Sequence, residues 1–202
     1  MPVSNNFDTM DFTYFFRQMA LIIASPQKAW TPGPAAKLGA SNVRNSLLLP
    51  LLLLVTVCAF LGSILLENVT MKTSYSILVG IRFFLLDLFT VYLSALILRE
   101  ILKAMDLASD YSTSFTLIVF SLVPFFICQM ISLFFESFAF VNILALYGLW
   151  IFRAGSEILL NPAGHKKTPL LIAVFVVITE LYIGLNLALS SIFTRIYFGF
   201  FN

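Results

Sequence analysis

Four ionisable side chains lie inside long apolar stretches of this sequence, and groups of these types could carry protons, ions or lipid headgroups: Arg82, Asp87, Arg153 and Glu180. Charged groups within a bilayer are costly, which makes them candidates for a functional site. At a helical rise of about 1.5 Å per residue, Asp87 and Glu180 fall near the middle of their stretches. Arg82 lies about 7 Å from that depth on one side and Arg153 roughly 5–6 Å on the other. The sequence therefore predicts one interior network of two cations and two carboxylates.

This candidate network has two interpretations. In the first it is structural and fixes which helices face each other. In the second it is a pathway for a proton, an ion or a lipid headgroup, as charges at the midplane are in transporters. Arg153 also has a local partner, Glu157, at the helical i,i+4 spacing. This pair would belong to the cytoplasmic interface instead if the long Arg153 side chain snorkels.

The residue patterns that most enzymes and metal sites need are missing. The one histidine, His165, stands in a loop beside two lysines and has no HExxH or CxxC companions. Cys58 and Cys128 lie in apolar stretches, where we expect small buried side chains and no disulfide. Phosphate-binding loops and dinucleotide fingerprints are absent as well. The sequence predicts a protein that is not an enzyme and has no cofactor and no metal site.

The composition identifies the surroundings of these stretches. Of the 202 residues, 60% are hydrophobic and 11% are charged, whereas soluble domains have about 45–50% apolar and about 25% charged residues. So few charges cannot cover the surface of a soluble fold of this size. A net charge of +2 without a long basic run also argues against a nucleic-acid partner. A lipid bilayer is the expected environment.

Five stretches reach the roughly 20 apolar residues that a helix needs to cross a hydrocarbon core about 30 Å thick. Backbone groups in lipid must bond within their own segment, so these stretches are expected to be helices. We expect an all-α integral membrane protein in which residues 46–202 form a bundle of five transmembrane helices. The second, fourth and fifth would share the charged interior, and the nearly uncharged first and third would face lipid. The stretches cover approximately 46–66, 76–98, 115–135, 138–160 and 169–193.

Residues 1–45 form a separate amino-terminal segment. A helix is predicted over Phe7–Ala24, and it is almost long enough to span. Asp8, Asp11 and Arg17 favour instead an amphipathic helix that lies in the membrane interface. Trp30, which follows a short polar connection, is expected to anchor this segment at the level of the lipid headgroups.

The basic residues of the loops predict the orientation. Lysine and arginine concentrate in cytoplasmic loops, so the amino terminus should be cytoplasmic and the carboxyl terminus outside. One side would carry Arg17, Lys28, Lys37, Arg44, Arg99, Lys103, Lys166 and Lys167, and the other only Lys72 and Arg195.

Several short motifs resemble those of a known family. They are Tyr111–Phe115 (YSTSF), Ser121–Pro124 (SLVP), Tyr147–Trp150 (YGLW) and the Asn161-Pro162 pair before two lysines. With the Pro26…Trp30 element, this pattern resembles the Yip family, five-span membrane proteins named for interaction with Ypt/Rab GTPases. The resemblance covers about residues 20–195, and the short amino-terminal region is similar to that of the prokaryotic branch.

The resemblance implies five spans, a cytoplasmic amino terminus and the bacterial cytoplasmic membrane. It implies a non-enzymatic protein that organises the membrane or partner proteins, in homo- or hetero-oligomers. GTPase recruitment is not expected, because the long polar amino-terminal segment of the eukaryotic members is missing. The alternative is a small transporter, channel or lipid-handling protein that uses the intramembrane charges.

Overall fold

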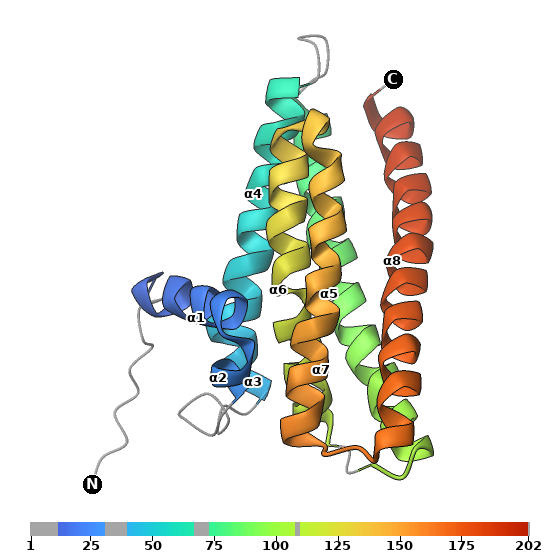
Figure 1. The fold of residues 1–202 in the computed structure, drawn as a ribbon. Helices are drawn as coiled ribbons and strands as arrows, with labels where there is room; N and C mark the ends of the chain where they lie inside the picture. Colours follow the sequence, from blue (N-terminus) through green and yellow to red (C-terminus); the bar gives the residue numbers. More distant parts are fainter. Residues whose placement is uncertain (1–11, 31–39, 67–72, 108–109, 202) are drawn as a thin grey trace, which may run out of the picture.

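The computed structural model describes residues 12–30, 40–66, 73–107 and 110–201, and no strand occurs in these ranges (Figure 1). The protein is therefore all-α in the part described. Residues 7–11, with which the expected amino-terminal helix begins, lie outside it. The elements are α1 (Phe12–Ala24), α2 (Pro26–Trp30), α3 (Ala40–Val43), a π-helical turn (Arg44–Leu48), α4 (Leu49–Leu66), α5 (Thr73–Ala104), α6 (Tyr111–Phe134), the 3₁₀ helix η2 (Glu136–Leu146), α7 (Tyr147–Leu159) and α8 (Gly164–Phe201).

Four helical segments of the described chain are long and apolar enough to cross a membrane. They run over Ala40–Leu65, Thr73–Ala104, Tyr111–Phe134 and Gly164–Gly199, and contain 26, 32, 24 and 36 residues. At about 1.5 Å per residue each exceeds the roughly 30 Å of a hydrocarbon core. These helices are compatible with a multi-pass membrane protein, and they correspond, to within one residue at their ends, to the first, second, third and fifth predicted stretches.

The fourth predicted stretch is helical but divided. Its first half is the eleven-residue 3₁₀ helix η2, and its second half is α7, with 13 residues. Helix α7 alone is about 20 Å long, which is too short to cross. Both halves pack along α6, so together they follow it over most of its length (Figure 1).

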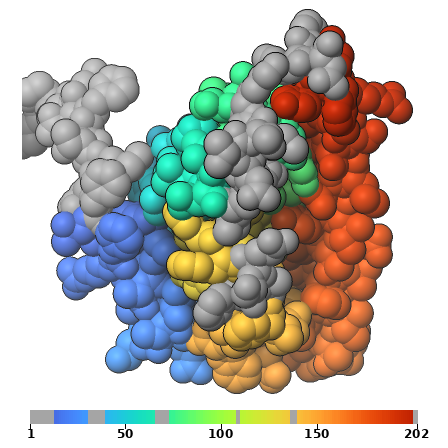
Figure 2. Space-filling view, turned by 90° about the horizontal axis from the view of Figure 1, so that it is seen from above, coloured from blue at the N-terminus to red at the C-terminus, as the bar shows by residue number. Residues whose placement is uncertain are grey.

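The long helices stand side by side, and the short amino-terminal helices pack on one flank. Figure 1 shows α1 lying crosswise to the bundle, with α2 and α3 beneath it. Seen along the bundle in Figure 2, the amino-terminal helices and α8 lie on opposite flanks, with η2 and α7 between them. On its inner side α1 buries Phe15, Met19 and Ile22, while Phe16 is exposed.

Burial within the bundle differs from the prediction for the third span. Of the 18 residues in the apolar part of α6 that could cross a membrane, 61% are buried, whereas only 11% are buried in the corresponding part of α8. The expectation that the third span faces lipid is therefore wrong. A stretch without charges is equally suited to lipid and to the centre of a bundle, so its composition could not distinguish the two. Buried polar side chains of α6, such as Ser121 and Gln129, mark it as the central helix.

Backbone features follow from particular residues. Pro50 has no backbone N–H to donate to the preceding turn and its ring would clash there, and the π-helical turn Arg44–Leu48 ends two residues before it. Helices α5 and α7 end in the same way, with Asp106 (φ 51°) and Asn161 (φ 42°) in the left-handed region. Asp and Asn tolerate this conformation better than other residues with a side chain.

Candidate intramembrane polar site

One amide joins three helices at the centre of the bundle. The side-chain nitrogen Nε2 of Gln129, on α6, donates to Asp87 Oδ1 on α5 at 3.3 Å and to Tyr182 Oη on α8 at 3.2 Å. Asp87 is 0% exposed and Gln129 4% exposed. The three residues, here called the Asp87 cluster, fix α5, α6 and α8 against each other away from solvent.

The Asp87 cluster is not fully satisfied. Asp87 Oδ2 and Gln129 Oε1 are both buried and have no hydrogen-bond partner in the described part of the chain. A buried polar atom without a partner costs roughly 1–3 kcal/mol. The cluster therefore holds the helices together without being optimal for stability.

Arg82 does not reach Asp87. Its Nη2 donates to Asn186 Oδ1 on α8 at 2.7 Å, and its guanidinium lies 5.2 Å from the centre of the Phe83 ring. Asn186 follows Tyr182 by one helical turn, so this bond is a second link between α5 and α8. Arg82 Nε remains without a partner among the described residues.

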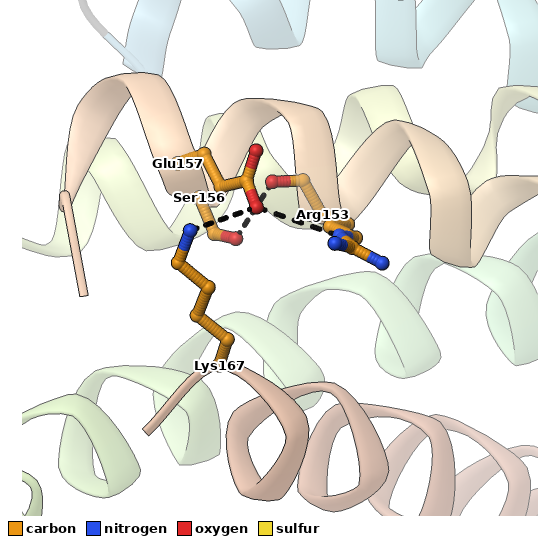
Figure 3. Close-up of polar contacts among 4 residues, drawn as sticks. All are labelled: Arg153, Ser156, Glu157 and Lys167. Atoms are coloured by element: carbon orange, nitrogen blue, oxygen red, sulfur yellow. Dashed lines mark hydrogen bonds and ion pairs between the residues drawn. The ribbon is translucent and has the colours of Figure 1, made fainter. Parts of the chain in front are cut away.

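Arg153 belongs to a different cluster, near the end of α7 (Figure 3). Its Nε lies 3.4 Å from Glu157 Oε1, as the i,i+4 spacing predicts. Lys167 Nζ, from the start of α8, contacts the same oxygen at 3.1 Å. Ser156 Oγ donates to the Arg153 carbonyl at 2.9 Å. The Arg153, Glu157 and Lys167 side chains are partly exposed, whereas Ser156 is buried, and the ion pairs tie α7 to α8 outside the buried core.

Glu180 is exposed and separate from both clusters. At about 100° per residue it lies about 200° around α8 from Tyr182, so it points away from the bundle. The prediction of one interior network of Arg82, Asp87, Arg153 and Glu180 is thus not met by the geometry. Position along a span gives the depth of a residue, but the direction of its side chain depends on how its helix is rotated.

Trp30 is a packing residue and not a headgroup anchor. It is 3% exposed, its Nε1 donates to the Ile151 carbonyl at 3.1 Å, and its ring centre lies 4.7 Å from that of Phe120. A Cβ placed on Gly155 would lie 2.5 Å from the indole. The ring of Trp30 fills the space that the missing side chain of Gly155 leaves. This contact cannot be predicted from the presence of one aromatic residue in the sequence.

An apolar cleft of about 220 Å³ lies beside the Asp87 cluster. Its walls come from α5, α6, η2, α7 and α8, and Tyr182 is in the wall while its hydroxyl bonds Gln129. Asp87 and Gln129 do not line it, so the cleft reaches the cluster only through Tyr182. The lining residues are Thr90, Ser121, Leu122, Phe125, Ala145, Leu146, Gly148, Leu149, Phe152, Val174, Phe175, Ile178, Thr179, Tyr182 and Ile183.

Some of these partners carry a signal in the sequence and others do not. Gln129 and Asn186 are polar residues within apolar stretches, which is a signal for hydrogen bonds between helices. Tyr182 gives no such signal, because tyrosine is common at many depths of a membrane helix. The sequence predicts a loop at Lys167, and the contact of this residue with Glu157 depends on how α7 turns into α8.

No group of three or more potential metal ligands of the His, Cys, Asp or Glu type forms among the described residues. Cys58 and Cys128 are both free thiols. Comparisons of the chain with protein-family models, with curated proteins and with solved structures find no match.

Proposed function

We propose that this chain is a non-enzymatic, Yip-type multi-pass protein of the bacterial cytoplasmic membrane, which organises the membrane or partner proteins. The observation that carries the proposal is that Asp87 is buried and has no access to the cleft. Its carboxyl group is fully buried, bonds an amide that links three helices, and does not border the cleft. A charge pathway requires access to its ionisable groups, whereas a structural role does not.

The path of the chain supports five crossings. Lys166 Nζ, at the start of α8, donates to the carbonyl of Met105, just beyond the end of α5. Helix α6 begins after this same connection and runs away from it. Residues 136–160 must therefore return along the bundle before α8 can begin, as η2 and α7 do (Figure 1). In the proposed topology this divided segment is the fourth span.

The proposed orientation places Lys103, Lys166 and Lys167 in the cytoplasm and Arg195 outside. The first three surround the connections from α5 to α6 and from α7 to α8. Basic residues favour the cytoplasmic side in short loops. The crosswise direction of α1 and its exposed Phe16 support an interfacial position for this helix.

Contacts between the motifs support the Yip-type assignment. A Cβ on Gly148, in the YGLW motif, would lie 2.1 Å from the carbonyl oxygen of Ser121, in the SLVP motif. Trp30 packs in turn on Gly155 and bonds Ile151. The helices that carry Pro26…Trp30, SLVP and YGLW, which are α2, α6 and α7, thus pack against one another.

The experiment is Asp87→Ala in vesicles, with Ser74→Ala as a control at a partly exposed position of the same helix. If the carboxyl group is structural, Asp87→Ala removes the acceptor of the Gln129 bond and lowers the thermal unfolding temperature and the recovery of folded protein together. A folded Asp87→Ala protein of unchanged stability that loses a measurable proton or ion flux would overturn the proposal.

Lipid handling is the second candidate function, and the apolar cleft is the observation that favours it. Fluorescent phospholipid movement in proteoliposomes would test it, with Thr179→Trp to fill the cleft and Ile172→Trp as a control at an exposed position of α8. Movement that is faster than in empty vesicles and is abolished only by Thr179→Trp supports this function. Movement equal to that in empty vesicles contradicts it.

A further inference from the structure

Helix α8 has a free face. It packs chiefly on α5 and only lightly on α7, at the edge of the bundle (Figures 1 and 2). The packed side carries Tyr182 and Asn186, which bond Gln129 and Arg82. The opposite side has no neighbour in the described chain. An apolar face of this kind would ordinarily meet only lipid.

Glu180 makes this face unsuitable for lipid. It lies 16 residues from the start of the 38-residue α8, near mid-helix, and it is exposed. It forms no hydrogen bond or ion pair with the residues that the structure describes. Along α8 the nearest cations are Lys167, 13 residues or about 20 Å before Glu180, and Arg195, 15 residues or about 22 Å after it. Both distances are beyond the reach of the side chains. A charged carboxyl group facing hydrocarbon is costly unless another molecule supplies a partner.

Small residues accompany Glu180 on this outer face. Gly184 follows by one turn, and a Cβ placed on it would meet nothing within 4 Å. Ala188 and Ser191 continue the exposed face along the next two turns. Small residues at this spacing allow two membrane helices to approach closely enough for side chains to hydrogen-bond between them.

We propose that the outer face of α8 binds the same face of a second copy, with Glu180 opposite Glu180. Every copy inserts in one orientation, so a two-fold axis along the membrane normal brings the two carboxyl groups to the same depth. Two such groups can share one proton and hydrogen-bond each other. A second copy thus satisfies Glu180 without a foreign cation. The inference depends on α8 crossing the bilayer and not on the Yip-type role.

Disulfide cross-linking tests the geometry. In a Cys58→Ala, Cys128→Ala background, Gly184→Cys, Ala188→Cys and Ser191→Cys should form dimers on oxidation in native membranes. Phe175→Cys is the control, because it is also exposed but lines the cleft, about 140° around α8 from Glu180. Equal or greater cross-linking at Phe175→Cys would overturn the proposal.

The carboxyl group is tested by single-molecule photobleaching in vesicles at several protein-to-lipid ratios. Glu180→Leu should weaken the dimer about 3–30-fold, as expected for the loss of an interhelical hydrogen bond. Glu180→Gln, which still donates and accepts, should weaken it less. A folded wild-type protein that stays monomeric at all ratios overturns the dimer and leaves the proposed topology and function standing. An unaltered dimer in Glu180→Leu overturns the assigned role of Glu180.

Discussion

Trp30 fills the space that Gly155 leaves open on α7, and the contact joins residues 125 positions apart in the sequence. An added Cβ on Gly155 would lie 2.5 Å from Cε2 and 2.6 Å from Cζ2 of the indole, and 2.9 Å from a methyl group of Leu117. The indole is also held by its bond to the Ile151 carbonyl. The amino-terminal segment is therefore attached to the bundle by direct packing.

Gly155→Ala should detach Trp30 and lower the free energy of unfolding. Rigid neighbours lie on two sides of the new methyl group, and overpacking of this kind costs about 1–3 kcal/mol. The measurement is unfolding in mild detergent, followed by tryptophan fluorescence. Gly199→Ala is the matched control, because nothing lies within 4 Å of a Cβ there. Equal stability of the two variants would show that the indole can shift without loss.

Asn161→Val should destabilise the turn from α7 to α8. Asn161 has a φ of 42°, and the left-handed region costs a residue with a Cβ about 1–2 kcal/mol, more for a branched one. Asn161→Gly should be tolerated, because glycine adopts this conformation without strain. Thermal unfolding of the three proteins gives the comparison. Equal loss of stability in both variants would point to the Asn161 side chain instead.

The sequence predicted the helices well and their rotation poorly. Apolar runs of 20 residues or more identify helices because lipid leaves the backbone no other partner. Arg153 and Glu157 were paired correctly, since their i,i+4 spacing places them within one helix. Asp87 and Glu180 were placed together wrongly, since their contact required knowledge of how two helices turn towards each other. Trp30 was misplaced for a related reason, because its site is made by Gly155, far along the chain.

Gln129→Leu should separate α8 from the other helices more than Tyr182→Phe does. The leucine leaves Asp87 Oδ1 and the Tyr182 hydroxyl without their common donor, whereas the phenylalanine removes one bond only. We expect the free energy of unfolding to fall by roughly 1–3 kcal/mol in Gln129→Leu, which leaves a buried group without a partner, and by about 1 kcal/mol in Tyr182→Phe, which loses one hydrogen bond. Steric trapping or denaturant unfolding in bicelles gives both values. If the Gln129→Leu protein is as stable as the Tyr182→Phe protein or more stable, the Gln129 amide is not the group that holds the helices together.

Cysteine labelling should distinguish five crossings from four. In the cysteine-free background, Lys103→Cys and Lys167→Cys should react with an impermeant maleimide only in inside-out vesicles, and Arg195→Cys only in right-side-out vesicles. The reason is that the start of α8 contacts Met105 at the end of α5, so both ends lie on one side of the membrane. Solubilised protein, labelled at all three sites, is the control. If residues 136–160 did not cross, Lys103→Cys and Lys167→Cys would label from opposite sides, and the divided segment would have to lie along one membrane face.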